Sequence, residues 1–183
     1  MRVISGTAKS LRLKTIEGDA TRPTTDRIKE TLFNIIGCEV YDSRFLDLFA
    51  GSGGIGIEAL SRGAYSCDFV DNNLKCANVI KENLRFTHLD NKAQVIKGDV
   101  ISYIKGCRNK QYDIIFIDPP YRDGFEIDVL KSISGNGLCH KDTVVILEAL
   151  REFDEESVLE CGFLVEKVKV YGTNKHIFMK CKI

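Results

Sequence analysis

Apolar and polar residues follow two different periods along this chain, and the two periods alternate. Short apolar runs with the length of buried parallel strands occupy 44–49, 67–70, 93–97, 112–117 and 143–148. Amphipathic stripes with helical spacing lie between and around them, at 25–36, 57–60, 72–85, 99–105, 126–134 and 155–160. Strands that alternate with helices predict an α/β fold of the doubly wound kind.

The two ends of the chain add elements to this core. Residues 1–5 and 11–15 predict two short strands around the turn at 6–10, a small N-terminal β-hairpin. Thr24 or Thr25 is the expected cap of the first helix, and Gly37 is its expected end. The segments 164–170 and 176–182 predict a final antiparallel pair. We expect a single domain over 1–183, with residues 1–40 as an extension and residues 41–183 as the core.

A glycine-rich turn, Gly51-Ser52-Gly53-Gly54-Ile55-Gly56, joins the strand at 44–49 to a helix. Glycine lets a backbone approach a ligand closely, and the helix that follows offers N–H groups without partners. Asp71 lies 20 residues after Gly51, at the end of the next apolar run. A carboxylate there can accept both hydroxyl hydrogens of an adenosine ribose. The segment therefore predicts a nucleoside cofactor.

Gly51, Gly53 and Gly56 also satisfy the dinucleotide fingerprint, so a nicotinamide-dependent oxidoreductase has to be weighed. Asp47 argues against that reading, because its carboxylate would repel a pyrophosphate at the mouth of the turn. The same carboxylate would attract the ammonium group of S-adenosylmethionine. We therefore favour S-adenosylmethionine as the cofactor.

The motif Asp118-Pro119-Pro120-Tyr121 ends the apolar run at 112–117. Because proline has no N–H, the strand stops there with carbonyl groups left unpaired. A carboxylate, carbonyl oxygens and an aromatic ring then meet at the carboxyl edge of the sheet, where open α/β folds bind ligands. That combination suits an unstacked base with an exocyclic amino group, and the motif is typical of amino-group methyltransferases. A plain strand-to-loop turn is the alternative.

Charge is zero overall but uneven, since residues 1–29 hold seven basic and three acidic residues. Six of these cations are candidate contacts for RNA phosphates: Arg2, Lys9, Arg12, Lys14, Arg22 and Arg27. An ordinary solvated hairpin would have similar composition.

The length of 183 residues suits one core, and no apolar stretch approaches the roughly 20 residues of a membrane span. Scattered cysteines and three distant histidines predict a reducing cytoplasm and no metal site.

Three segments together resemble one bacterial family. Arg22 to Ile36, Asp47 to Gly53 and Asp118 to Tyr121 stand in the order and spacing of the small-subunit (16S) ribosomal RNA guanine-N2 methyltransferases of RsmD type. The resemblance covers nearly the whole chain, although Ser5, Ala8 and Ser10 stand where relatives tend to have glycine and basic residues. It implies a Rossmann-like, class I S-adenosylmethionine-dependent methyltransferase fold, with a seven-stranded, mostly parallel sheet whose last strand is antiparallel.

The resemblance also implies roles for individual residues. Phe49, Ala50, Gly51 and Gly53 would line the methionine and ribose of the cofactor. Asp71 and Asn72 would lie at the ribose, while Asp99 and Val100 would lie at the adenine. Asp118 and the Pro119 carbonyl would accept the amino hydrogens of the target guanine, in a motif that Pro120 and Tyr121 complete, and Tyr121 would stack on the extruded base.

The resemblance implies ribosomal RNA as partner, within an assembly intermediate of the small subunit, and we expect a monomer. A DNA adenine-N6 or cytosine-N4 methyltransferase remains an alternative, but only about 40 residues precede the catalytic sheet, too few for a sequence-reading domain. A non-catalytic RNA-binding or assembly protein is the other alternative, and it predicts loss of Asp71 or Asp118, which are both present.

Overall fold

Seven strands occur among the residues that the computed structural model describes, which are 1–16, 25–108, 110–120 and 125–182. The chain divides into two compact units, Met1–Gly98 and Asp99–Ile183. Hydrogen bonds order the strands β3-β2-β1 in the first unit and β4-β5-β7-β6 in the second. The expected class is confirmed: a seven-stranded α/β sheet that is mostly parallel, with the last strand antiparallel.

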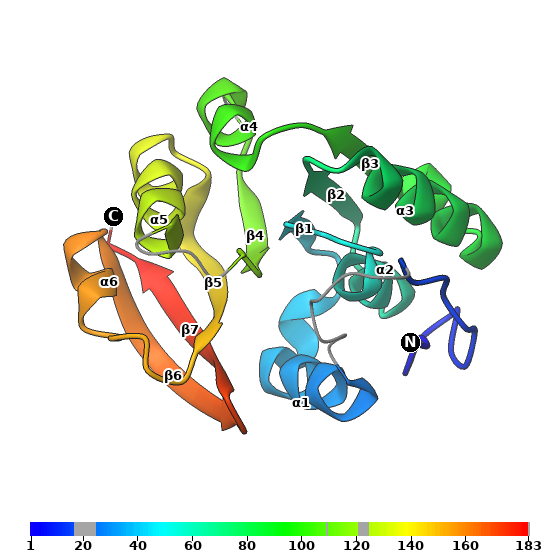
Figure 1. The fold of residues 1–183 in the computed structure, drawn as a ribbon, viewed down its shortest axis with the longest axis horizontal. Helices are drawn as coiled ribbons and strands as arrows, with labels where there is room; N and C mark the ends of the chain where they lie inside the picture. Colours follow the sequence, from blue (N-terminus) through cyan, green and yellow to red (C-terminus); the bar gives the residue numbers. More distant parts are fainter. Residues whose placement is uncertain (17–24, 109, 121–124, 183) are drawn as a thin grey trace. The chain divides into compact units, whose positions relative to one another are not determined.

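The first unit has three parallel strands, with the helices α2 and α3 packed on them (Figure 1). The strands are β1 (Arg44–Leu48), β2 (Ser66–Asp71) and β3 (Ala93–Lys97). The helices are α1 (Asp26–Ile36), α2 (Gly54–Ser61) and α3 (Leu74–Thr87), with short 3-10 turns η1 (Gly37–Val40) and η2 (Asp90–Lys92). α2 contacts β1 and β2, whereas α3 contacts β2 and β3. The ends of β1 and β2 thus lie beside each other.

The second unit has one parallel and two antiparallel strand pairs. β4 (Tyr112–Ile117) is parallel to β5 (Cys139–Leu150), and β7 (Asn174–Cys181) is antiparallel to both β5 and β6 (Phe163–Tyr171). The helices are α4 (Val100–Gly106), α5 (Phe125–Gly135) and α6 (Ser157–Glu160). The turn at Gly172 and Thr173 joins the last two strands, as the sequence predicts.

Local signals explain most helix ends. The Thr25 side chain accepts the N–H of Ile28, and Gly37 ends α1 with a φ of 62°. Asn73 caps α3 by accepting the N–H of Lys75, so this helix begins at Leu74, two residues later than expected. Asp99 caps α4 in the predicted way, by accepting the N–H of Ser102.

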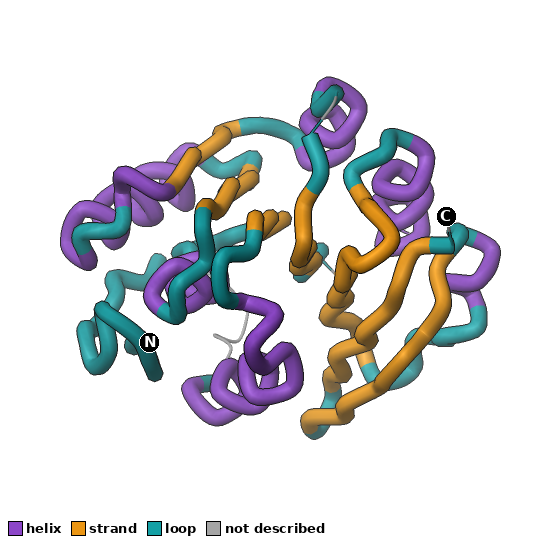
Figure 2. Tube along the Cα trace, turned by 180° about the vertical axis from the view of Figure 1, so that it is seen from behind, coloured by secondary structure: helices purple, strands orange, loops and turns teal. Residues whose placement is uncertain are grey.

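The predicted N-terminal hairpin is present, but its paired part is shorter than expected. Residues 1–3 and 10–13 run antiparallel, joined by the bridge between Arg2 and Arg12 and by backbone hydrogen bonds from Val3 to Leu11, from Ser10 to Val3 and from Leu13 to Met1. Figure 2 draws the segment as loop, because a single bridge does not make a regular strand. After Val3, the N–H groups of Ile4 and Ser5 donate to the carboxylate of Glu58 in α2, and Thr7 donates to the Ser61 carbonyl in the same helix. The short hairpin therefore packs on α2.

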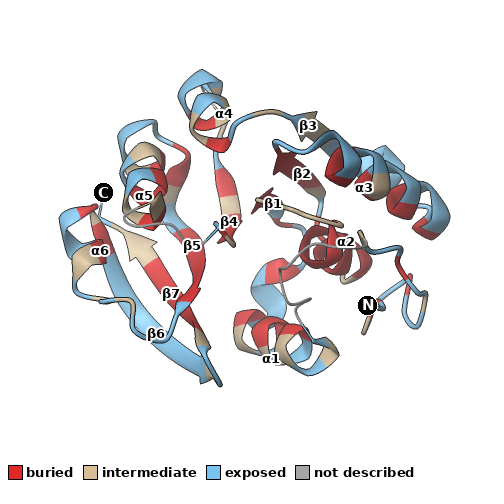
Figure 3. Ribbon diagram, in the orientation of Figure 1, coloured by how far each residue is buried: buried red, intermediate tan, exposed pale blue. Residues whose placement is uncertain are grey.

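Burial differs sharply between elements (Figure 3). Every residue of α2 is buried, whereas β6 is exposed from Leu164 to Val170. Four of the seven cysteines are buried, and all seven are free thiols. No helix in the described parts of the chain combines the length and the apolar character that crossing a bilayer requires.

Candidate active site

The glycine turn between β1 and α2 is held in an unusual backbone conformation. Phe49 has a φ of 64°, which is uncommon for a residue with a side chain, and Gly51 and Gly53 have φ values of 55° and 80°. The N–H groups of Phe49 and Ala50 both donate to the carbonyl of Val70, at 3.0 and 3.1 Å. Strain of this kind persists only where surrounding contacts fix it, and it is frequent at ligand sites. Here the end of β2 provides those contacts.

Asp71 fixes the same turn with its carboxylate. Oδ2 accepts the N–H of Gly51 at 2.9 Å, and Oδ1 accepts the N–H of Asn73 at 2.8 Å. Asp71 thus joins the glycine turn to the start of α3. A carboxylate has about four acceptor positions, so each oxygen keeps one position for a further donor such as a ribose hydroxyl.

Asp47 is almost fully buried below the turn, at 2 % exposure. Its Oδ2 accepts the N–H of Gly56 at 2.8 Å, in the first turn of α2. Burial raises the pKa of Asp47 to about 7, the nearby charge of Asp71 adds to this, and the hydrogen bond from Gly56 opposes it. Asp47 therefore anchors the start of α2, and its contact with a cofactor ammonium stays a prediction.

Two glycines of the turn do different things. A Cβ on Gly56 would lie 2.3 Å from the Phe69 ring and 2.7 Å from the Cys67 sulfur, so glycine is needed there for α2 to approach β2. A Cβ on Gly51 would meet no atom of the described residues within 4 Å. The backbone at Gly51 thus faces open space, whereas Gly56 is a packing residue.

The other predicted cofactor residues lie near strand ends. Asn72 is exposed and follows Asp71 directly. Asp99 is exposed, and the hydrogen bonds from Ser102 lower the pKa of its carboxyl group. Val100 is buried in the first turn of α4. Asp99 therefore has a capping role, and its predicted contact with adenine is not tested by these bonds.

Asp118 comes directly after β4, whose last residue Ile117 lies opposite Leu147 of β5. The strand ends here as predicted, with Asp118 partly exposed, Pro119 buried and Pro120 exposed. Tyr121 lies outside the described residues. The acceptor groups expected for a target base thus stand at the carboxyl end of a buried parallel strand.

Five of the six predicted RNA-binding cations are described, and all five are exposed: Arg2, Lys9, Arg12, Lys14 and Arg27. Two of them make ion pairs, Arg2 with Asp26 at 2.7 Å and Lys14 with Glu82 at 2.6 Å. Arg22 lies outside the described residues. Exposed pairs of this kind contribute little to stability, so both cations can exchange partners.

Two buried polar residues around the turn were not predicted. Asn83 is 1 % exposed and donates to the Ser52 carbonyl of the turn at 3.0 Å. Glu58 is fully buried and holds the N-terminal segment. A signal for Asn83 is present in the sequence, because it falls between Ile80 and Leu84 on the apolar stripe of α3. A polar residue at such a position needs a polar partner.

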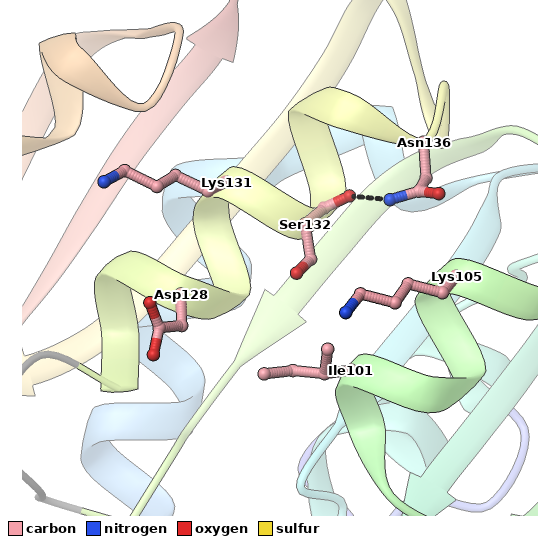
Figure 4. Close-up of a pocket in the computed structure, with 6 residues that line it drawn as sticks. All are labelled: Ile101, Lys105, Asp128, Lys131, Ser132 and Asn136. Atoms are coloured by element: carbon pink, nitrogen blue, oxygen red, sulfur yellow. Dashed lines mark hydrogen bonds between the residues drawn. The ribbon is translucent and has the colours of Figure 1, made fainter.

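A metal site and a surface depression are two further features that could mark a functional site. No cluster of three metal-ligating side chains occurs in 1–16, 25–108, 110–120 or 125–182. A depression of about 440 Å³ lies in the second unit, at α4 and α5 (Figure 4). Its lining consists of Ile101, Lys105, Asp128, Lys131, Ser132 and Asn136, and it contains none of the predicted site residues.

The family of the chain follows from its similarity to known sequences. The family model described as conserved hypothetical protein 95 matches residues 1–180. The chain belongs to this family. Two relatives are the "Putative rRNA methyltransferase YlbH" of Bacillus subtilis and the "Ribosomal RNA small subunit methyltransferase D" of Escherichia coli. The resemblance predicted from the three sequence segments is therefore confirmed, and the chain is a methyltransferase.

The similarity extends over most of each protein. The Bacillus relative is 42% identical over 156 residues, which are 84% of this chain and 85% of the relative. The Escherichia relative is 31% identical over 149 residues, which are 81% of this chain and 74% of the relative. The solved structure titled "Putative methyltransferase yhhF from Escherichia coli" superposes with a TM-score of 0.88 at 27% identity, covering 100% of this chain and 98% of that one.

Proposed function

We propose that this protein transfers a methyl group from S-adenosylmethionine to the N2 amine of a guanine in small-subunit ribosomal RNA. The observation that carries the proposal is the turn Asp47–Gly56. Phe49 in this turn has a positive φ, the Asp71 carboxylate accepts the N–H of Gly51, and the backbone at Gly51 faces open space among the described residues. Relatives named as ribosomal RNA methyltransferases supply the substrate class.

The residues of the turn fit the proposed cofactor. Open space above Gly51 lets a ligand approach the backbone without meeting a side chain. Each oxygen of Asp71 accepts one N–H and keeps a position for a ribose hydroxyl. Burial raises the pKa of Asp47 to about 7, and an ammonium of the methionine end bound beside it would favour the charged form of this carboxyl group. Asp99 is assigned to the adenine amino group.

Asp118 and Pro119 are assigned to the target base. When bound, the cofactor supplies a methyl group on a sulfonium, which is an activated leaving group. The difficulty then lies with the guanine amine, whose lone pair is delocalised into the ring. Asp118 and the Pro119 carbonyl accept the two amino hydrogens, which favours a pyramidal nitrogen and directs its lone pair. Such positioning lowers a barrier by several kcal/mol.

The remaining steps concern the base and its proton. A guanine in a duplex or a stack does not expose N2, so the base leaves the stack and Tyr121 packs on its face, worth roughly 1–3 kcal/mol. After transfer, the surplus proton on N2 passes to Asp118 or to water. The surrounding site thus binds and orients, with no covalent intermediate on the protein.

Asp118 provides the direct test. We expect Asp118→Ala to reduce turnover by about 100-fold or more, because it removes an acceptor that acts on the reacting amine. Affinity for S-adenosylhomocysteine, measured by calorimetry, should stay within about two-fold of the wild type. Asp113→Ala, in the same strand, is the matched control and should retain turnover. Normal turnover by Asp118→Ala would contradict the assignment.

The substrate needs its own experiment. We place the reaction in the cytoplasm, on RNA within a partly assembled small subunit, with the protein acting as a monomer. Labelled methyl transfer should be compared on naked small-subunit RNA, on assembly intermediates and on duplex DNA, all from cells lacking the protein. Mass mapping of the labelled RNA should then show N2-methylguanosine at one position. Transfer to the DNA alone would overturn the proposal in favour of a DNA methyltransferase.

A further inference from the structure

Asn83 joins two segments that lie far apart in the sequence. Its Oδ1 accepts the N–H of Lys14 at 2.8 Å, and its Nδ2 donates to the Lys14 carbonyl at 3.0 Å. The same Nδ2 donates to the carbonyl of Ser52, in the glycine turn, at 3.0 Å. One buried amide therefore binds both backbone groups of Lys14 and one carbonyl of the proposed cofactor turn.

The start of the N-terminal segment contacts the same turn and its helix. The Met1 side chain covers Gly54, where an added Cβ would lie 2.1 Å from the Met1 sulfur. A Cβ on Gly6 would lie 1.7 Å from the Ser61 carbonyl oxygen, at the end of α2. Residues 1–7 thus follow α2 from its start to its end, and Asn83 fixes Lys14, later in the same segment, to the turn.

The N-terminal segment also has its cations exposed. Lys9 and Arg12 are exposed, and the Lys14 ammonium pairs with the exposed carboxylate of Glu82 at 2.6 Å. An RNA phosphate can replace Glu82 at the Lys14 side chain while the Lys14 backbone stays bound to Asn83. If RNA binding restricts the motion of residues 1–16, the Asn83 side chain would pass this restriction on to Ser52 in the glycine turn.

We propose that Asn83 is a positioning residue that couples RNA binding on residues 1–16 to cofactor binding at the glycine turn. The proposal rests on the proposed function, because it takes the cations as phosphate contacts and the turn as the cofactor site. RNA that orders the segment makes the turn more rigid, and a cofactor that orders the turn makes the segment more rigid. Such coupling is reciprocal, so each ligand tightens the other by the same factor.

The test measures the affinity for S-adenosylhomocysteine with and without saturating small-subunit RNA from cells lacking the protein. We expect RNA to tighten wild-type binding by at least about five-fold. Asn83→Asp keeps the acceptor for Lys14 but loses both N–H donors, and it should reduce the coupling below about two-fold. Asn78→Asp makes the same change at an exposed position of α3 and should retain the wild-type coupling.

Gly6→Ala supplies an independent second variant, because its Cβ would meet the Ser61 carbonyl and displace the segment from α2 while Asn83 and the residues of the turn keep their identity. It should leave RNA-free affinity for S-adenosylhomocysteine within about two-fold of the wild type and remove the coupling. Coupling that survives in Gly6→Ala overturns the proposal, even where Asn83→Asp fails to fold. Wild-type affinity that RNA does not change also overturns it. If the wild type binds neither S-adenosylhomocysteine nor the RNA, the result would instead contradict the proposed function, and this inference with it.

Discussion

The ammonium of Lys29 in α1 lies 3.0 Å from the carboxylate of Glu58 in α2, with both side chains fully buried. The same ammonium donates to the carbonyl of Arg2, and the same carboxylate accepts from the N–H groups of Ile4 and Ser5. Burial lowers the pKa of Lys29, against the opposing effect of Glu58. The pair therefore ties the N-terminal segment to two helices at a position that water does not reach.

Removing one partner of this pair should be costly. We expect Lys29→Met to lower the free energy of unfolding by about 3 kcal/mol, because the buried carboxylate of Glu58 would lose one of its two cationic partners and keep only Arg62, at 2.8 Å, among the described residues. Urea unfolding followed by circular dichroism measures this. Lys81→Met, at an exposed position of α3, is the control and should change stability by less than about 0.5 kcal/mol. Equal stability of the two variants would mean that the buried pair contributes nothing.

Asp47 should make stability depend on pH. Burial raises its pKa from 3.8 to about 7. A carboxyl group with a higher pKa in the folded state stabilises the fold below pH 4, and this contribution is lost as the pH rises to about 7. Asp47→Asn lacks the titration but can still accept the N–H of Gly56. Relative to this variant, the wild type should therefore lose at most about 4 kcal/mol of stability between pH 4 and pH 8.

Unfolding curves of the two proteins across this pH range provide the measurement, and the difference between them cancels the titration of other groups. Asp90→Asn, in the exposed turn η2, should give no such difference. A wild-type curve parallel to that of Asp47→Asn would show that Asp47 titrates normally in the folded protein.

Asp71 should matter for both the turn and the cofactor. We expect Asp71→Ala to weaken binding of S-adenosylhomocysteine by about 10- to 100-fold, because hydrogen bonds to a charged group contribute about 1.5–3 kcal/mol. Calorimetry measures the dissociation constant. Asp71→Asn keeps one acceptor for the N–H of Gly51 or Asn73. Its dissociation constant should therefore lie between those of the wild type and Asp71→Ala. An unchanged constant in Asp71→Ala would contradict the ribose assignment.

The N-terminal cations should set the salt dependence of RNA binding. Replacing Lys9 and Arg12 by glutamine should reduce the slope of log affinity against log salt by about two, because each phosphate contact contributes close to one. Filter binding of small-subunit RNA at several salt concentrations measures the slope. Lys167→Gln with Lys169→Gln, both exposed in β6, removes the same charge elsewhere. A slope equal to that of the wild type would place the RNA footprint on another surface.

Periodicity predicted the elements well where the local signal and the tertiary contacts agree. The strand at Tyr112–Ile117 and the cap at Asp99 lie where the sequence placed them. β5 is longer than predicted, since it begins at Cys139, where polar residues hide the start of the strand. The N-terminal hairpin is shorter than predicted because, after Val3, the N–H groups of Ile4 and Ser5 bind Glu58, which lies more than 50 positions away in the sequence.

The sequence by itself determined the α/β order, the glycine turn and the placing of Asp71 and Asp118 at strand ends, because these depend on spacing and on residue type. Only the tertiary structure decided what the buried polar groups bind. The sequence marks Asn83 only as a polar residue on an apolar stripe, and it does not mark Glu58 at all. Their partners at Ser52, Lys14 and Ile4 become neighbours only through folding. Hydrogen bonds between distant segments leave no periodic trace, since the chain between them can have any length.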